Sequence, residues 1–158
     1  VSKLLVDEAR VLHPKREFVL NLSGNLEGLW DRARIGQVFS NLIGNAVQYG
    51  FTDAPITVTV EGLPDKVVLS VHNEGVPISP DALGNIFNSL TRGEPHPDDE
   101  SGHGALSVNL GLGLYISKEI VTAHGGSISV TSSEKDGTAF CAHFNRKALH
   151  GAFETAPA

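Results

Sequence analysis

The sequence predicts a single α+β domain, a two-layer sandwich in which helices cover one face of a mixed, mostly antiparallel sheet. Two pairs of strand-like segments are each joined by a short turn, which favours antiparallel hairpins. Two longer amphipathic segments have the period of helices. Hydrophobic residues make up 41% and charged residues 19% of the 158 residues, which suits one compact core. Helices packed on one face of such a sheet bury the apolar side of both layers.

The first third of the chain contains the clearest helix. Residues 2–12 predict an amphipathic helix and 18–22 a short strand. Residues 31–49 predict a long helix with Asp31 as N-cap and Gly50 at the C′ position. At about 100° per residue, one face of this helix is apolar and an adjoining stripe is polar. The apolar face carries Ile35, Phe39, Leu42, Ala46 and Tyr49, and the stripe carries Arg34, Asn41, Asn45 and Gln48.

The remaining segments alternate hairpins with helices. Strands are expected at 56–61 and 66–72 around a GLPD turn, and at 128–130 and 138–144 around an EKDG turn. Ser79-Pro80 opens a short helix that ends near Phe87, and a second long helix is expected at 110–124. Residues 91–109 show no period. Since long loops in compact domains are usually lids or binding loops, we expect a lid at about 93–109.

Composition excludes several classes of function. Twelve Lys and Arg against 18 Asp and Glu give a net charge of −6, so we expect no nucleic-acid partner. Cys141 is the only cysteine, which excludes an internal disulfide framework, and we expect it to fill the core. No apolar run is long enough to span a bilayer, so no direct membrane contact is expected. The chain starts with Val1, which suggests a piece of a longer protein. A single cysteine fits a reducing compartment, and we expect the domain to be cytoplasmic.

Two amides on the long helix form the first candidate site. Asn41 and Asn45 are four residues apart, so their side chains share one face. An amide oxygen is a hard, neutral ligand that suits Mg²⁺. Two solvated asparagines explain the same pattern, and this alternative stays open on the residues alone.

Two glycine-containing segments form the other candidates. In HNEGVPI, residues 72–78, Gly75 and Pro77 shape a turn and Asn73 offers a donor and an acceptor to the edge of a purine. In NLGLGLYI, residues 109–116, glycines at a helix start leave N–H groups free to hold phosphate. An ordinary strand-to-helix turn and an ordinary loop-to-helix junction remain the alternatives.

Taken together, five segments resemble the catalytic ATP-binding domain of bacterial sensor histidine kinases, in the GHKL superfamily shared with gyrase, Hsp90 and MutL. RIGQVFSNLIGNAVQYG is similar to the N box of that family, HNEGVPI to its G1 box and NIFNSLTRGE to its F box. NLGLGLYISKEIVTAHGG is similar to the G2 box, and GTAF at 137–140 to the closing strand. The resemblance covers residues 1–146, implies the Bergerat-type fold, and leaves 147–158 as a tail.

The resemblance implies a role for each matching residue. Asn45 is the Mg²⁺ ligand, Asn41 lies beside the phosphates, and Arg92 reaches a phosphate; Asn41 and Arg92 are the implied catalytic positions. Tyr49 stacks on adenine, Asn73 binds its exocyclic amine and Thr138 completes the pocket. Gly111 and Gly113 hold the phosphates at the helix start. The implied ATP-binding set also includes Gln48, Gly75, Pro77, Ile78, Leu110, Leu112 and Leu114.

The residue at position 41 favours phosphoryl transfer over hydrolysis. ATP-hydrolysing members of the superfamily carry a Glu there to activate water, whereas Asn41 cannot act as a general base. We therefore expect a protein-histidine kinase domain that uses ATP and Mg²⁺. An ATP-driven clamp is disfavoured for the same reason.

Departures from the family pattern motivate an alternative. Asn73 replaces the usual Asp, Gln48 a basic residue, Leu90 a Phe and Asn109 a Gly. A regulatory protein-binding module with weakened or lost nucleotide binding therefore remains open.

The resemblance also implies partners. No histidine of the chain has the setting of a phosphoacceptor, so the acceptor is expected on a dimerising helical hairpin of the same protein. A response regulator receiver domain then takes the phosphate, and the parent protein is expected to be a homodimer.

Overall fold

The computed structural model describes residues 1–88 and 103–146, and for 103–111 the backbone only. Five strands form one sheet in the order β1-β2-β3-β5-β4. β1 pairs with β2 in parallel, and the other three pairings are antiparallel. The predicted mixed, mostly antiparallel sheet is confirmed. The strands are β1 (Phe18–Ser23), β2 (Ile56–Gly62), β3 (Lys66–Asn73), β4 (Ser127–Ser133) and β5 (Gly137–Asn145).

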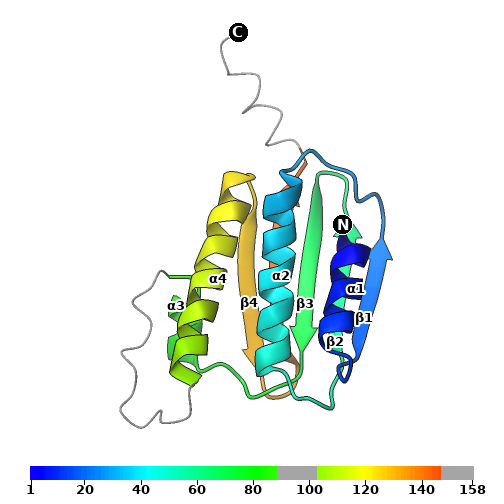
Figure 1. Cartoon of the computed structure of the whole chain (residues 1–158). Helices are drawn as coiled ribbons and strands as arrows, with labels where there is room; N and C mark the ends of the chain where they lie inside the picture. The colour runs from blue at the N-terminus through cyan, green and yellow to red at the C-terminus, as the bar shows by residue number, and fades with distance from the viewer. Residues whose placement is uncertain (89–102, 147–158) are drawn as a thin grey trace.

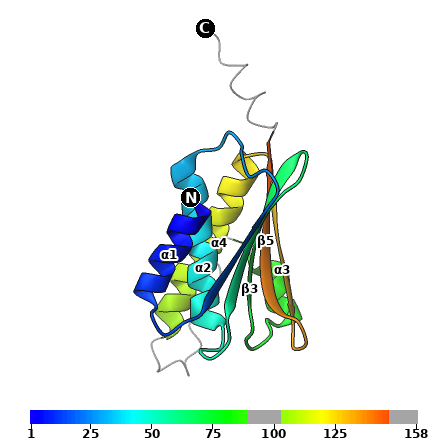
Figure 2. The same cartoon turned by 90° about the vertical axis from the view of Figure 1, so that its right-hand side faces the viewer.

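Helices form the second layer of the sandwich. Three of them, α1 (Ser2–Leu12), α2 (Arg32–Tyr49) and α4 (His103–Ala123), run along the sheet (Figure 1). Viewed along the edge of the sheet, all three lie on the same side (Figure 2). The short α3 (Pro80–Asn85) begins at Ser79, whose hydroxyl accepts a hydrogen bond from the N–H of Ala82 as an N-cap. The predicted two-layer α+β sandwich is confirmed.

The core between the layers follows the alternation of the strands. On β3 every second residue is buried, beginning with Val67, Leu69 and Val71. Asn73 continues this inward-facing series at the end of the strand and is 4% exposed. A polar side chain thus occupies the last position of an otherwise apolar row. Buried polar groups need a partner in the protein, in water or in a ligand.

Both ends of α2 are fixed by specific contacts. Asp31 is the N-cap, as predicted, and its side chain accepts from the N–H of Arg34. Gly50 follows the last turn but has φ −71°, so the left-handed C′ geometry that we predicted is wrong. Glycine is needed there for space instead, because a Cβ would lie 2.5 Å from the carbonyl oxygen of Ala46.

The second long helix begins earlier than predicted. α4 starts at His103, so the expected loop at 91–109 is wrong for residues 103–109, and residues 89–102 lie outside the described part. Each helical glycine costs about 1 kcal/mol relative to alanine. Good helix formers such as Ala105 and Leu106, together with packing of α4 along α2, outweigh that cost.

Cys141 does not fill the core: it is partly exposed and its Sγ lies 3.5 Å from the hydroxyl of Ser70 on the neighbouring strand. Within the described residues, none of the helices combines the length and apolarity that crossing a membrane would require.

Candidate nucleotide-binding site

The end of α2 and the segment after β3 meet at two glycines. Gly50 and Gly75 form an isolated antiparallel bridge, and the N–H of Phe51 donates to the carbonyl of Glu74 at 2.7 Å. A Cβ on Gly75 would lie 2.5 Å from the carbonyl oxygen of Tyr49. Glycine at position 75 is therefore required for this close approach. The predicted N-box and G1-box segments are brought together at this corner.

Asn73 and Thr138 lie side by side at the same corner. They are paired positions of β3 and β5, and both are buried. The hydroxyl of Thr138 lies 2.7 Å from that of Ser132, which accepts from the N–H of Ile78 at 2.9 Å. This chain of hydrogen bonds ties the segment after Asn73 to the β4–β5 hairpin. The purine-edge residues expected from separate parts of the sequence are therefore neighbours.

Three residues in the last two turns of α2 border the corner. Asn45 is 5% exposed and precedes Gly50 by five residues, about 7.5 Å along the helix axis. Within residues 1–88 and 112–146, the side chains of Asn45 and Asn73 have no hydrogen-bond partner. Tyr49 is 52% exposed, so it is not buried with the other residues of the apolar face. Gln48 is exposed as well.

Asn41 lies one turn before Asn45, is half-buried and contacts α4. Its Nδ2 donates to the main-chain oxygen of Gly113 at 3.1 Å and to the hydroxyl of Ser117 at 3.2 Å. A Cβ on Gly113 would lie 3.5 Å from the Cγ of Asn41. The N box and the G2 box are thus in direct contact.

The G2 glycines do not open a helix in this structure. Gly111 and Gly113 lie in the interior of α4, where N–H groups bond to the carbonyl four residues earlier. The prediction of free amides at a helix start is wrong here. Leu114 belongs to the core, whereas Leu112 is partly exposed. Arg92 lies outside the described residues, and Pro77 is exposed.

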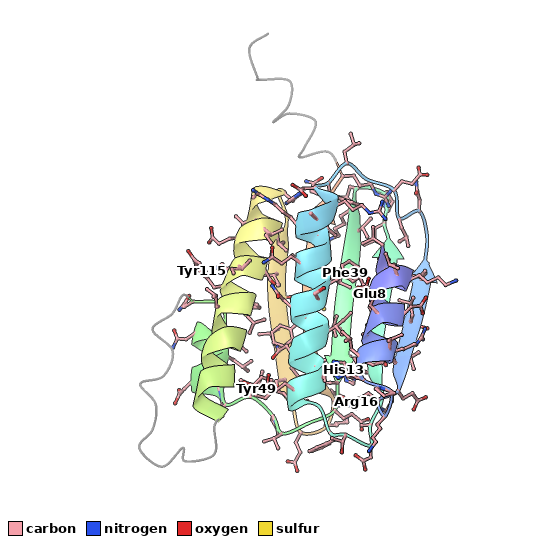
Figure 3. All side chains as sticks on the ribbon, viewed as in Figure 1. Glu8, His13, Arg16, Phe39, Tyr49 and Tyr115 are labelled. Atoms are coloured by element: carbon pink, nitrogen blue, oxygen red, sulfur yellow. The ribbon has the colours of Figure 1, made fainter. Side chains whose placement is uncertain are left out.

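Sequence reasoning missed two residues that support the site. These residues are Ser117, which accepts a hydrogen bond from Asn41, and Arg16. The Arg16 guanidinium donates to the carbonyls of Val47 at 2.8 Å and Phe51 at 3.1 Å, on either side of Tyr49. Figure 3 shows Arg16 and Tyr49 at the same end of the helical layer. No pattern in the sequence pairs Arg16 with carbonyls 31 and 35 residues away.

The sequence is similar to a family of ATPases and to known sensor proteins. Residues 30–148 match the family described as histidine kinase-, DNA gyrase B- and HSP90-like ATPase. The chain is 35% identical over 117 residues to the sensor protein VanSC of Enterococcus gallinarum, covering 73% of this chain and 30% of that protein. It is 36% identical over 110 residues to the sensor histidine kinase CusS of Escherichia coli K12, covering 70% and 22%. The chain spans less than a third of the length of these relatives.

Solved structures agree with the sequence relatives. The catalytic domain of histidine kinase ThkA superposes with a TM-score of 0.70 at 27% identity, covering 91% of this chain and 92% of that one. Full-length ShkA in complex with AMPPNP gives a TM-score of 0.70 at 25% identity, covering 90% and 29%. The chain therefore belongs to the histidine kinase-, DNA gyrase B- and HSP90-like ATPase family, as an ATPase domain of the sensor histidine kinase type.

Proposed function

We propose that this domain binds ATP with Mg²⁺ and donates the γ-phosphoryl group to a histidine on a dimerising helical hairpin outside this chain. The observation that carries the proposal is the pair of buried amides, Asn45 and Asn73, at one corner of the fold. The amide atoms of both residues are not among the fully buried side-chain atoms without a partner, so they still reach the solvent at this corner and are available to a polar ligand. A nucleotide with a bound cation offers the groups that both amides need.

Adenine recognition is assigned to the β3 side of the corner. The Asn73 amide oxygen accepts from the exocyclic amine, and Thr138 completes the edge contact from β5. Gly75, Pro77 and Ile78 bring main chain close to the base, supported by the Ile78–Ser132–Thr138 hydrogen bonds. The exposed ring of Tyr49 stacks on the base, with Gln48 beside it.

The metal and the phosphates are assigned to the α2–α4 side. Amide oxygens of Asn45 and Asn41 are hard ligands of the type that Mg²⁺ takes, directly or through its waters. The described residues contain no cluster of three or more His, Cys, Asp and Glu suited to a metal, so these amides are the candidate donors. Bound Mg²⁺ would neutralise charge on the phosphates. Gly113 contacts Asn41. The segment Leu110–Leu114, which includes Gly111, is proposed to border the phosphates, and Arg92 is proposed to reach them.

Transfer is favoured over hydrolysis by the chemistry of position 41. An amide does not accept a proton at neutral pH, and the Asn41 nitrogen already donates to Gly113 and Ser117. A kinase needs no base for water, because the attacking nucleophile is an imidazole nitrogen. Catalysis then consists of positioning and charge neutralisation.

The assembly around the domain is also proposed. Residues 1–146 form the catalytic domain with an ATP lid at about 93–109, and 147–158 form a tail. The acceptor hairpin belongs to the same protein, which forms a cytoplasmic homodimeric kinase module. A response regulator receiver domain receives the phosphate.

Phosphotransfer to a supplied hairpin tests the proposal. The domain is mixed with the histidine-bearing hairpin of its own parent protein and γ-labelled ATP, with and without Mg²⁺. We expect Mg²⁺-dependent label on the hairpin histidine. Absence of transfer together with absence of ATP binding would contradict the proposal and favour a regulatory binding module.

The Asn73→Asp variant should bind ATP as well as or better than the natural domain. A carboxylate accepts from the adenine amine in a charge-assisted bond, worth about 1.5–3 kcal/mol against about 1 kcal/mol for a neutral bond. Without nucleotide the buried carboxylate should lower the free energy of unfolding. Calorimetric ATP titration measures the effect, and loss of ATP binding would show that Asn73 donates a hydrogen bond instead.

A further inference from the structure

A serine outside the predicted nucleotide-binding set lies in the interface between two helices. Ser117 of α4 is 0% exposed, among core residues such as Leu114, Ile120 and Val121. Its hydroxyl oxygen accepts from the Nδ2 of Asn41 on α2. A buried hydroxyl without a partner lowers stability, so the contact satisfies Ser117 while it holds Asn41.

The second contact of Asn41 fixes which atom its amide presents. The same Nδ2 donates to the main-chain oxygen of Gly113 at 3.1 Å. A carbonyl oxygen can only accept, so the nitrogen of Asn41 must face α4. A primary amide has two N–H donors, and Gly113 and Ser117 use both. These bonds leave the Oδ1 of Asn41 as the atom available to a ligand.

We infer that Ser117 is a positioning residue, which with the Gly113 carbonyl turns the Asn41 amide so that it presents oxygen, and not N–H, to the bound nucleotide. This inference rests on the proposed function. An amide oxygen attracts a cation or the hydrogen of a metal-bound water and repels a phosphate oxygen. Asn41 therefore acts on the Mg²⁺ side of the ligand together with Asn45. It does not donate a hydrogen bond to the phosphates.

A double-mutant cycle with and without magnesium tests the inference. The Kd for ATP is measured by calorimetry in Mg²⁺ and in EDTA for the natural domain, Ser117→Ala, Asn41→Ala and the double variant. Ser117→Ala should reduce the gain in affinity that Mg²⁺ provides by about fivefold, the usual effect of one lost hydrogen bond. Its Kd in EDTA should stay within about twofold of the natural value, since a donor to phosphate is not lost. In the Asn41→Ala background, Ser117→Ala should have no further effect.

Two more variants separate the hydrogen bond from packing. Ser117→Cys keeps nearly the same shape but is a poor acceptor, so it should behave like Ser117→Ala and serves in its place if that variant does not fold. Ser40→Ala is the matched control, because Ser40 is an exposed serine on α2 next to Asn41. It should leave both Kd values unchanged.

Different results would overturn different claims. If Ser117→Ala loses equal ATP affinity in Mg²⁺ and in EDTA, Ser117 is only structural. If Ser117→Ala still changes the affinity in the Asn41→Ala background, Ser117 does not act through Asn41. Either result overturns the inference while ATP binding by the natural domain stands. If the natural domain binds no ATP in either condition, the proposed function itself fails and the inference fails with it.

Discussion

Replacing Asn45 with Ala should remove the magnesium-dependent part of ATP binding while the domain stays folded. Asn45 is 5% exposed and has an amide oxygen near the corner where the end of α2 meets the segment after β3. It has no hydrogen-bond partner among the described residues, so the substitution leaves no described group without its partner. Alanine also has the higher helix propensity. An interaction with a charged group is worth about 1.5–3 kcal/mol, so the Kd in Mg²⁺ should rise about 10- to 100-fold.

Calorimetric titration of ATP in Mg²⁺ and in EDTA measures this effect, and transfer to a supplied histidine hairpin measures its consequence. Gln37→Ala is the matched control, since it removes another amide from the same helix at an exposed position. It should change neither value. Near-normal transfer by Asn45→Ala would contradict the assignment of Asn45 as a metal ligand.

The Gly75→Ala variant should disrupt the corner where Gly50 and Gly75 meet. The added Cβ would lie 2.5 Å from the carbonyl oxygen of Tyr49, closer than real Cβ contacts allow. The bridge between Gly50 and Gly75 must then open, which moves the end of α2 away from the segment that follows Asn73. Overpacking of this kind costs about 1–3 kcal/mol of unfolding free energy, and ATP affinity should fall at least about tenfold.

A glycine of α2 provides the control for that variant. Gly44 is exposed in α2, and a Cβ there would meet nothing within 4 Å. Gly44→Ala should raise the free energy of unfolding by up to about 1 kcal/mol, because alanine favours helix, and leave ATP affinity unchanged. Denaturant unfolding and ATP titration of the two variants together measure both effects. Equal ATP affinity of Gly75→Ala and Gly44→Ala would show that the glycine bridge does not shape the site.

Local pattern predicted most of the fold. β2 and β3 were predicted to within one residue at each end, because β-branched residues alternate there between two turns. Asp31 and Ser79 marked the starts of α2 and α3 because short polar side chains cap free N–H groups. Local pattern does not predict the start of α4, because glycines such as those near this start are typical of loops. α4 as a whole contacts α2, which lies far away in the sequence, and local pattern does not report such a contact.

The site was predictable in its residue types but not in its contacts. Spacing of four residues placed Asn41 and Asn45 together, and the structure keeps them on the inner side of α2. The partner of Asn41, Ser117, is 76 residues away, and nothing local distinguishes it from other helical serines. The period of α2 places Tyr49 on the apolar face, but the residue is 52% exposed, which the period alone does not predict.

Thermal unfolding with and without nucleotide tests the central claim most directly. The domain is unfolded alone, with ATP and Mg²⁺, and with ATP and EDTA. At about 100 times Kd, a ligand that binds only the folded state adds about 2.7 kcal/mol to the free energy of unfolding. We predict a rise in Tm with ATP that is larger when Mg²⁺ is present. An unchanged Tm at millimolar ATP with Mg²⁺ would contradict nucleotide binding at the corner formed by α2, β3 and β5.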